Sequence, residues 1–218
     1  MRIGVLATGS GTNFQALVDA CRSGYAPAEV VAVLTNKADA LVLDRAARAG
    51  VPGVFVDPKA APTREEYDRM LLEQLKLHGV ELVCNAGYMR ILSSEFVSEY
   101  RDRALNIHPS LLPSFPGLHA VRQALEHGVR VTGVTVHVVT DDLDGGPVLL
   151  QRAVDVLAGE PVESLTSRLH LVEYALYPKA LKLWASGMVR VDGRRVEVSG
   201  DVEDPPWAGS LPPGLRSA

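Results

Sequence analysis

The sequence is poor in several features that identify broad classes of protein. Only two cysteines, Cys21 and Cys84, occur among 218 residues, too few for a disulfide framework or a cysteine-rich metal site. We expect both to be buried, inert thiols, although Cys84 lies near a predicted strand end, where a nucleophile could also stand. No run of about 18 apolar residues and no signal-peptide pattern occurs, so the cytoplasm is the predicted location.

An excess of positive charge is also missing. The 22 lysines and arginines are outnumbered by 26 aspartates and glutamates, which gives a formal net charge of −4. Proteins that bind nucleic acids or membrane surfaces electrostatically carry a basic patch or a polybasic run. We therefore expect small-molecule partners, with anionic ligands held at local sites, and neither a nucleic acid nor a membrane as partner.

The chain does contain a regular alternation of buried-type strands and helical patterns. Hydrophobic residues make up 47% of it, enough to build a sizeable core. Strands that alternate with helices are predicted at residues 2–7, 29–36, 53–56, 80–86 and 103–108. This pattern predicts an α/β, Rossmann-like, mostly parallel sheet with helices on both faces, and ligands beyond the carboxyl ends of its strands.

The second half of the chain follows another pattern. Strands rich in β-branched residues are predicted at 130–140 and 147–156, then a long helix over 161–186 and a hairpin over 188–198. We expect one domain over residues 1–199, with a phosphate-binding half at about 1–100 and a catalytic half at about 101–199. Residues 200–218 are rich in proline and glycine, which predicts a flexible tail.

A glycine loop follows the first predicted strand. Residues 8–13 read TGSGTN, and apolar residues at helical spacing begin at Phe14. Backbone N–H groups at such a helix start suit a phosphate, and glycines let it approach closely. The loop is not a dinucleotide fingerprint, because Phe14 replaces the third glycine, and it lacks the lysine of a Walker loop. It predicts a single-phosphate site, with a plain tight turn as the alternative.

Two polar tips in the second half carry the predicted chemistry. In Asn106-Ile107-His108 the apolar middle residue places Asn106 and His108 on one face of an extended chain. The amide can donate to a developing oxyanion, and the imidazole can donate or move a proton. Asp144, in the turn DDLDGG at 141–146, is the candidate that would favour the imidazolium form. No attacking side chain is needed.

Structural interpretations of the same residues stand beside this one. A lone histidine after a strand can be a satisfied structural residue. The 141–146 segment can be only a tight turn, with Gly145 and Gly146 supplying positive φ. His137 alternates with valines, which indicates a packed strand residue rather than a ligand.

Three further features indicate binding surfaces. The loop Gly87–Leu92 mixes an aromatic, a methionine, aliphatics and an arginine, as in a wall for a flat heteroaromatic ligand or a loop packed on the core. Thr63 and Glu66 form a predicted capping box, and Arg64 between them opposes the helix dipole, so it either holds an anion or is solvated. Glu173, among apolar neighbours, needs a partner from the protein or from a ligand amine.

Taken in order, these motifs resemble the phosphoribosylglycinamide formyltransferase family. The resemblance runs from Met1 to about Trp184 and is specific because the order and the spacing of the motifs match together. The motifs are GSGTN at 9–13, TREEY at 63–67, AGYMRILS at 86–93, NIHPSLLP at 106–113, PGLH at 116–119 and DDLDGGP at 141–147.

The resemblance implies the formyltransferase fold and direct transfer of a formyl group from 10-formyltetrahydrofolate, a co-substrate, to the amine of glycinamide ribonucleotide. It implies that Asn106, His108 and Asp144 are catalytic, with His108 as the acid. The implied ribonucleotide site consists of Gly11, Thr12, Asn13, His170 and Glu173. The implied folate site consists of Arg64, Met89, Arg90, Ile91, Leu92, Asn106, Thr140 and Asp141. A monomer or a homodimer without a metal is expected.

Three positions depart from the family pattern. Thr12 stands where serine is common and keeps the hydroxyl, and Tyr88 replaces an expected phenylalanine. His170 replaces an expected glutamine, which leaves that contact open.

Four alternative functions share part of this pattern. Formyltetrahydrofolate hydrolase passes the formyl group to water and is expected to have a second histidine where Pro109 stands. Methionyl-tRNA formyltransferase needs a basic extension and lacks the GSGTN loop. A non-catalytic nucleotide-binding module would have no reason to keep Asn106, His108 and Asp144. A metal hydrolase using His108, His119 and Asp144 lacks a recognised ligand spacing.

Overall fold

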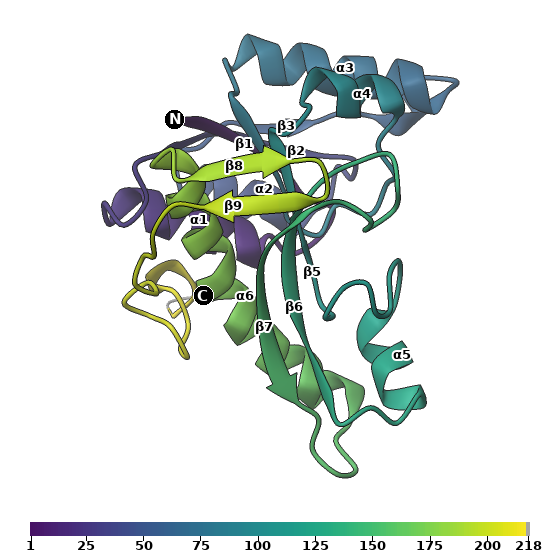
Figure 1. The fold of residues 1–218 in the computed structure, drawn as a ribbon. Helices are drawn as coiled ribbons and strands as arrows, with labels where there is room; N and C mark the ends of the chain where they lie inside the picture. Colours follow the sequence, from purple (N-terminus) through teal and green to yellow (C-terminus); the bar gives the residue numbers. More distant parts are fainter. Residues whose placement is uncertain (217–218) are drawn as a thin grey trace.

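The computed structural model describes residues 1–216 and contains a seven-stranded sheet and a separate two-stranded hairpin (Figure 1). The strand order is β3-β2-β1-β4-β5-β6-β7. These strands are β1 (Arg2–Leu6), β2 (Glu29–Thr35), β3 (Gly53–Phe55), β4 (Leu82–Asn85), β5 (Ala104–His108), β6 (Val131–Val138) and β7 (Val148–Asp155). β1 to β5 pair in parallel, and β6 and β7 are antiparallel. The predicted mostly parallel sheet is confirmed.

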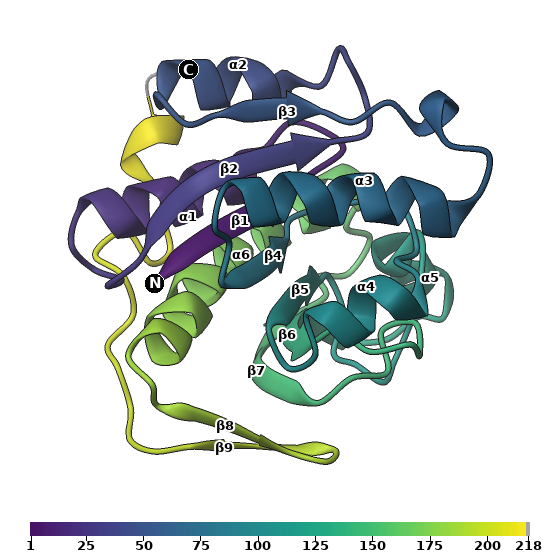
Figure 2. The ribbon, with the colours of Figure 1, turned by 90° about the horizontal axis from the view of Figure 1, so that it is seen from above.

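Helices cover both faces of this sheet because its central strands are apolar on both sides. The helices are α1 (Thr12–Arg22), α2 (Leu41–Arg48) and α6 (Val162–Ala185) on one face, and α3 (Arg64–Leu77) and α4 (Ser94–Glu99) on the other. Ile3 and Val5 of β1 belong to the core under the first set, and Leu6 belongs to the core under the second. Figure 2 shows α3 and α4 in front of the sheet.

The remaining elements are short. They are α5 (Ala120–Glu126), β8 (Val189–Asp192), β9 (Arg195–Val198) and the 3-10 turns η1 (Pro58–Ala60) and η2 (Pro213–Leu215). β8 and β9 form the predicted antiparallel hairpin, with Gly193 in its turn at φ 57.

The helix ends follow local signals in the sequence. Glu66 N donates to Thr63 Oγ1 at 3.2 Å, and Thr63 N donates to Glu66 Oε2 at 3.1 Å, so the predicted capping box is confirmed. α4 begins after Ser93, whose hydroxyl accepts from the backbone N–H of Phe96. α1 follows Gly11, which has φ 72 and no room for a Cβ beside Val42.

The C-terminal segment differs from the expected flexible tail. Trp207 is buried in the main core, and its Nε1 donates to the carbonyl of Tyr174 in α6 at 2.9 Å. Gly214 N donates to Asp19 Oδ2 in α1 at 2.8 Å. A large apolar ring and partnered backbone groups therefore hold residues 201–216 on the domain despite their proline and glycine content. Residues 217–218 of the predicted tail lie outside the described residues.

Both cysteines are free thiols. Burial raises the pKa of Cys21 to about 11 and that of Cys84 to about 12. A reactive cysteine needs a lowered pKa, so the structural interpretation of both thiols holds.

Candidate active site

Three loops meet at the carboxyl ends of β1, β4 and β5. The register pairs Leu6 with Asn85 and Asn85 with Asn106, so these three strands end side by side. Thr8 N donates to the carbonyl of Gly87 at 3.1 Å, and Met89 N donates to Thr8 Oγ1 at 3.0 Å. The glycine loop, the 87–92 loop and the Asn106–His108 tip thus form one region, as the parallel sheet predicts.

The structure brings Asn106, His108 and Asp144 together. Asp144 Oδ2 lies 3.4 Å from His108 Nδ1, and Asn106 Nδ2 donates to Asp144 Oδ1 at 3.4 Å. The His108 and Asp144 side chains are only 7% and 9% exposed. Low exposure strengthens the interaction of the ring with the carboxylate, because little water screens it.

Both ring nitrogens of His108 face an acceptor. Nδ1 faces the Asp144 carboxylate, and Nε2 lies 2.9 Å from the carbonyl oxygen of Phe115. A carbonyl can only accept, so Nε2 carries a hydrogen in this arrangement. The imidazolium form, with N–H on both nitrogens, satisfies both partners at once.

Asp144 is held ionised by its surroundings. Burial alone would raise its pKa, but hydrogen bonds from His137 and the Gly117 N–H, with the charges of His108 and His137, lower the pKa to about 2. The Gly117 N–H lies 2.7 Å from Oδ2. The carboxylate is therefore charged at neutral pH and remains a partner for an imidazolium.

The turn that carries Asp144 has a different backbone from the expected one. Positive φ occurs at Asp144 itself, at 51°, and not at Gly145 or Gly146. The expectation that the two glycines supply it is wrong. Gly146 is needed for another reason, because a Cβ there would collide with the carbonyl oxygen of Val138 on β6. Non-glycine residues held at positive φ cluster at active sites, so this backbone agrees with the role predicted for Asp144.

His137 is a member of the cluster that the sequence does not reveal. Its Nε2 lies 3.1 Å from Asn106 Nδ2 and 3.6 Å from Asp144 Oδ1. Its Nδ1 lies 3.0 Å from the carbonyl oxygen of Val138, which fixes the ring. Alternation with valines predicts its burial, which is confirmed, but gives no sign of these contacts. The signal is the antiparallel register that sets His137 opposite Asn106.

A second buried polar cluster joins the glycine loop to α6. Asn13 Nδ2 donates to Glu173 Oε2 at 2.7 Å, so the partner that Glu173 needs comes from the protein. Burial raises the pKa of Glu173, and the nearby charge of His170 and the bond from Asn13 oppose that rise. Asn13 Oδ1 is buried and has no partner among residues 1–216. Gly11, Thr12, Asn13, His170 and Glu173 are thus near one another, and one acceptor there is unused.

The residues of the implied folate site differ in how far they are exposed. Met89 and Ile91 are 62% and 57% exposed, whereas Leu92 is buried in the core under α3 and α4. The Arg90 guanidinium lies 4.5 Å from the centre of the Tyr67 ring. An exposed apolar pair beside a positioned arginine can contact a flat ligand.

Three polar residues of that implied site lie at its edges. Arg64 forms a surface ion pair with Glu65 at 3.3 Å, so the structure gives it an acidic protein partner. Thr140 Oγ1 donates to the carbonyl of Asp142 at 3.4 Å, and Asp141 is exposed. Their contribution to ligand binding stays a prediction.

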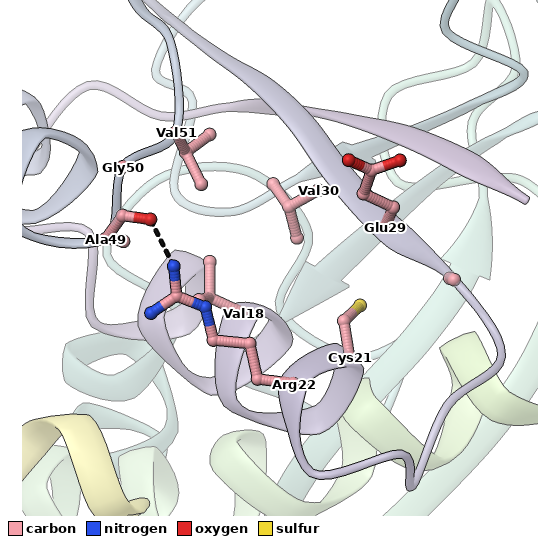
Figure 3. Close-up of a pocket in the computed structure, with 9 residues that line it drawn as sticks. Val18, Cys21, Arg22, Glu29, Val30, Ala49, Gly50 and Val51 are labelled. Atoms are coloured by element: carbon pink, nitrogen blue, oxygen red, sulfur yellow. Dashed lines mark hydrogen bonds between the residues drawn. The ribbon is translucent and has the colours of Figure 1, made fainter.

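A cavity of about 290 Å³ lies elsewhere, at the amino end of β2 (Figure 3). Val18, Cys21, Val30 and Val51 line it, and Arg22 at its rim donates to the carbonyl of Ala49. None of the residues predicted for catalysis or ligand binding contributes to this lining.

Two further observations concern residues 1–216 as a whole. No three histidine, cysteine, aspartate or glutamate side chains in this part of the chain are placed to bind one metal ion. None of its helices combines the length and the apolar character needed to cross a membrane.

Comparison with known sequences identifies relatives of this chain. The model of the formyl transferase family matches residues 1–181. Phosphoribosylglycinamide formyltransferase of Escherichia coli K12 is 45% identical over 94% of this chain and 100% of its own length. The trifunctional purine biosynthetic protein adenosine-3 of Drosophila pseudoobscura is 48% identical over 93% of this chain, which spans only 15% of that relative.

A solved structure agrees with these relatives. The crystal structure of glycinamide ribonucleotide transformylase 1 from Symbiobacterium toebii superposes with a TM-score of 0.90 and 52% identity. The match covers 92% of this chain and 94% of that one. The family model matches most of the sequence, and the Escherichia coli relative is matched along its full length. This chain therefore belongs to the formyl transferase family.

Proposed function

We propose that this chain transfers the formyl group of 10-formyltetrahydrofolate to the primary amine of 5′-phosphoribosylglycinamide, a step of purine biosynthesis. The products are formylglycinamide ribonucleotide and tetrahydrofolate. The observation that carries the proposal is the cluster of half-buried Asn106 with the buried side chains of His108 and ionised Asp144, at the sheet edge that also carries the glycine loop. The relatives named phosphoribosylglycinamide formyltransferase support this choice of substrates.

The proposed reaction is a direct transfer through a tetrahedral intermediate. The amine nitrogen attacks the formyl carbon, a new C–N bond forms, and the carbonyl oxygen becomes negative. The bond from that carbon to N10 of the folate then breaks, and a proton that leaves the attacking amine ends on N10. Because the acceptor amine attacks directly, no enzyme side chain has to form a covalent intermediate.

Asn106 and His108 are the proposed stabilisers of the oxyanion. Asn106 Nδ2 makes a long, 3.4 Å contact with Asp144, so this N–H can turn to the substrate at little cost. His108 has both nitrogens engaged, by Asp144 and by the carbonyl of Phe115, so one of these contacts gives way when it donates. The ionised Asp144 carboxylate orients the ring and favours its imidazolium form, which is its proposed role.

We place the ribonucleotide between the glycine loop and α6. The N–H groups at the start of α1 suit its phosphate, and Thr12 adds a hydroxyl. The unpartnered Asn13 Oδ1 and the Glu173 carboxylate offer acceptors to its amine or hydroxyl groups. His170, whose ring stacks on Tyr174, completes the proposed site.

We place the folate along the 87–92 loop and the turn that begins at Thr140. Met89, Ile91 and Leu92 supply apolar contact, and Arg90 and Asp141 supply charged groups. Arg64 lies at the start of α3 and would have to exchange its pairing with Glu65 for the ligand. This arrangement sets the formyl group near Asn106.

The proposal extends to the organisation of the chain. Residues 1–199 form one catalytic domain, in which about 1–100 hold the phosphate and about 101–199 supply catalysis and the folate site. The core cluster that spans β1, α1, β5 and α6 supports a single domain. We expect the enzyme in the cytoplasm, as a monomer or a homodimer, without a metal.

A turnover assay separates this proposal from its nearest rival. Loss of the formyl group from 10-formyltetrahydrofolate is followed by absorbance, with and without glycinamide ribonucleotide. Turnover that requires the ribonucleotide is the expected result. Equal turnover without it would mean that water is the acceptor and that the chain is a formyltetrahydrofolate hydrolase. Binding of both ligands without turnover would favour a non-catalytic module.

A further inference from the structure

Asn85, the last residue of β4, is a buried polar residue to which the proposed function gives no role. It is 7% exposed, and its Oδ1 is buried with no hydrogen-bond partner among residues 1–216. Its backbone pairs with β1 and β5, and its backbone carbonyl also accepts from the hydroxyl of Tyr177 at 2.9 Å. The side-chain amide oxygen therefore accepts no hydrogen bond from residues 1–216.

An unpartnered amide at the end of the apolar strand β4 is unusual. The rest of β4 is Leu82, Val83 and Cys84, all fully buried. Asparagine is depleted in strands, and a buried oxygen without a donor destabilises the folded state because folding removes its water partners. An aliphatic residue would serve the core better, so the amide is a candidate for binding something other than the protein.

The register shows which way this side chain points. Alternate residues of a strand face opposite sides of the sheet. Cys84 faces the core under α1 and α6, and Val83 faces the core under α3 and α4. Asn85 therefore faces the same side of the sheet as Val83, the side covered by α3 and α4. Leu92 belongs to the core on that side, and Val139 packs against it.

Asn85 is also the neighbour of the proposed catalytic amide. Its register partner on β5 is Asn106, and parallel partners point to the same side at a strand spacing of about 4.8 Å. On this side of the sheet, the proposed catalytic amide of Asn106 and the unpartnered amide of Asn85 are therefore neighbours on adjacent strands. Leu92, in the loop that follows β4, lies in the core on the same side. This sequence of groups suits a ring that is flat, apolar on its faces and polar at its edge.

We propose that the Asn85 carboxamide hydrogen-bonds the polar edge of the pterin ring of the formyl donor and is a specificity-determining residue for that substrate. The inference rests on the proposed function. The ring edge carries N–H and amino donors for Oδ1, and ring acceptors for Nδ2. A site built with a polar partner of this kind binds the correct heterocycle and penalises one that lacks the matching group.

The test uses Asn85→Leu, which is similar in size but cannot hydrogen-bond, and Asn85→Ala, which leaves space if leucine does not fit. Thr132→Val is the matched control, because Thr132 Oγ1 is also buried without a partner among residues 1–216 but lies near the start of β6, five residues before His137 of the cluster. Binding of 5-formyltetrahydrofolate, a stable reduced folate, is measured by calorimetry, and KM is measured for both substrates.

We expect both Asn85 variants to bind 5-formyltetrahydrofolate about ten-fold more weakly, as for the loss of one buried hydrogen bond. KM for the formyl donor should rise with it, KM for the ribonucleotide should not, and Thr132→Val should change neither. Unchanged folate binding by folded Asn85→Leu or Asn85→Ala would overturn the inference and leave Asn85 as an internally hydrated residue. Wild-type enzyme that neither binds the folate nor turns it over would instead overturn the proposed function.

Discussion

The two ends of the central sheet differ in what their loops carry. At the carboxyl end, the His108 and Asp144 side chains are buried, half-buried Asn106 donates to Asp144, and the pKa of Asp144 is lowered to about 2. At the amino end of β2, a cavity of about 290 Å³ is lined mainly by aliphatic side chains and a thiol whose pKa is raised to about 11, and its two charged residues, Arg22 and Glu29, make no contact with each other. Space alone does not identify an active site. The end with mutually oriented polar groups and a lowered carboxylate pKa has the means for chemistry, and the other end lacks such a group of side chains.

The largest expected effect is loss of turnover at the carboxyl end. Asp144→Asn removes the charge that favours the imidazolium form of His108, so kcat should fall by about 10²- to 10⁴-fold. Steady-state kinetics with both substrates measures this. Asp204→Asn is the control. It removes a carboxylate that pairs with Arg152 at 2.8 Å and takes no part in the cluster, so kcat should stay unchanged. Near wild-type turnover by folded Asp144→Asn would remove Asp144 from the mechanism.

The next effect concerns stability and not catalysis. Trp207 packs near Tyr25, in the loop before β2, with ring centres 6.3 Å apart. Trp207→Ala should lower the free energy of unfolding by about 3 kcal/mol and leave kcat unchanged. Urea denaturation measures the loss, and Trp207→Phe should recover part of it. An unchanged midpoint would mean that the C-terminal segment is loose, as its composition predicts.

A smaller effect follows from the low pKa of Asp144. The folded-state pKa of about 2 lies below the ordinary value of 3.8, so the unfolded chain takes up the proton first as the pH falls. The stabilisation is complete above that ordinary value and is lost as the pH falls towards 2. Its size is about 2 kcal/mol.

Urea denaturation over this acid range checks the sign. Wild-type enzyme should lose more stability between about pH 5 and pH 3 than Asp144→Asn, which has no proton to bind at this site. The same loss in both proteins would show that other carboxylates govern the acid dependence.

The smallest effect belongs to the cavity at the amino end. Val51→Ile adds one methylene group towards this space and should raise the free energy of unfolding by about 0.5–1 kcal/mol. Turnover and both KM values should not change. A fall in kcat after such a conservative filling would mean that the cavity takes part in function, and the contrast between the two ends would fail.

Much of the fold could be predicted because its signals are local. The capping box of Thr63 and Glu66, the stop of helices at glycines and the alternation of strands and helices each depend on a few neighbouring residues. Parallel strands with helical crossovers then follow from general rules of chain connection. The grouping of the loops after β1, β4 and β5 at one edge followed from the same rules.

The candidate site was predictable only in part. The order and spacing of the motifs led to Asn106, His108 and Asp144, and Asn13 proved to be the protein partner that Glu173 requires. The positive φ of Asp144 could not be read from Asp-Gly-Gly, because glycine is the residue that adopts such a backbone most easily. Whether Arg64 holds a ligand was also undecided, and its surface pairing with Glu65 does not decide it.

The sequence by itself determined the elements, their order and the chemistry of the residues at the strand ends, since periodicity, caps and side-chain type act over short distances. Only the tertiary structure decided which side chains meet. It set His137 opposite Asn106 through the antiparallel register, buried Trp207 against α6, and left the Asn85 amide without a partner among residues 1–216. Each of these depends on contacts between segments far apart in the chain, which only the packing of the whole domain fixes.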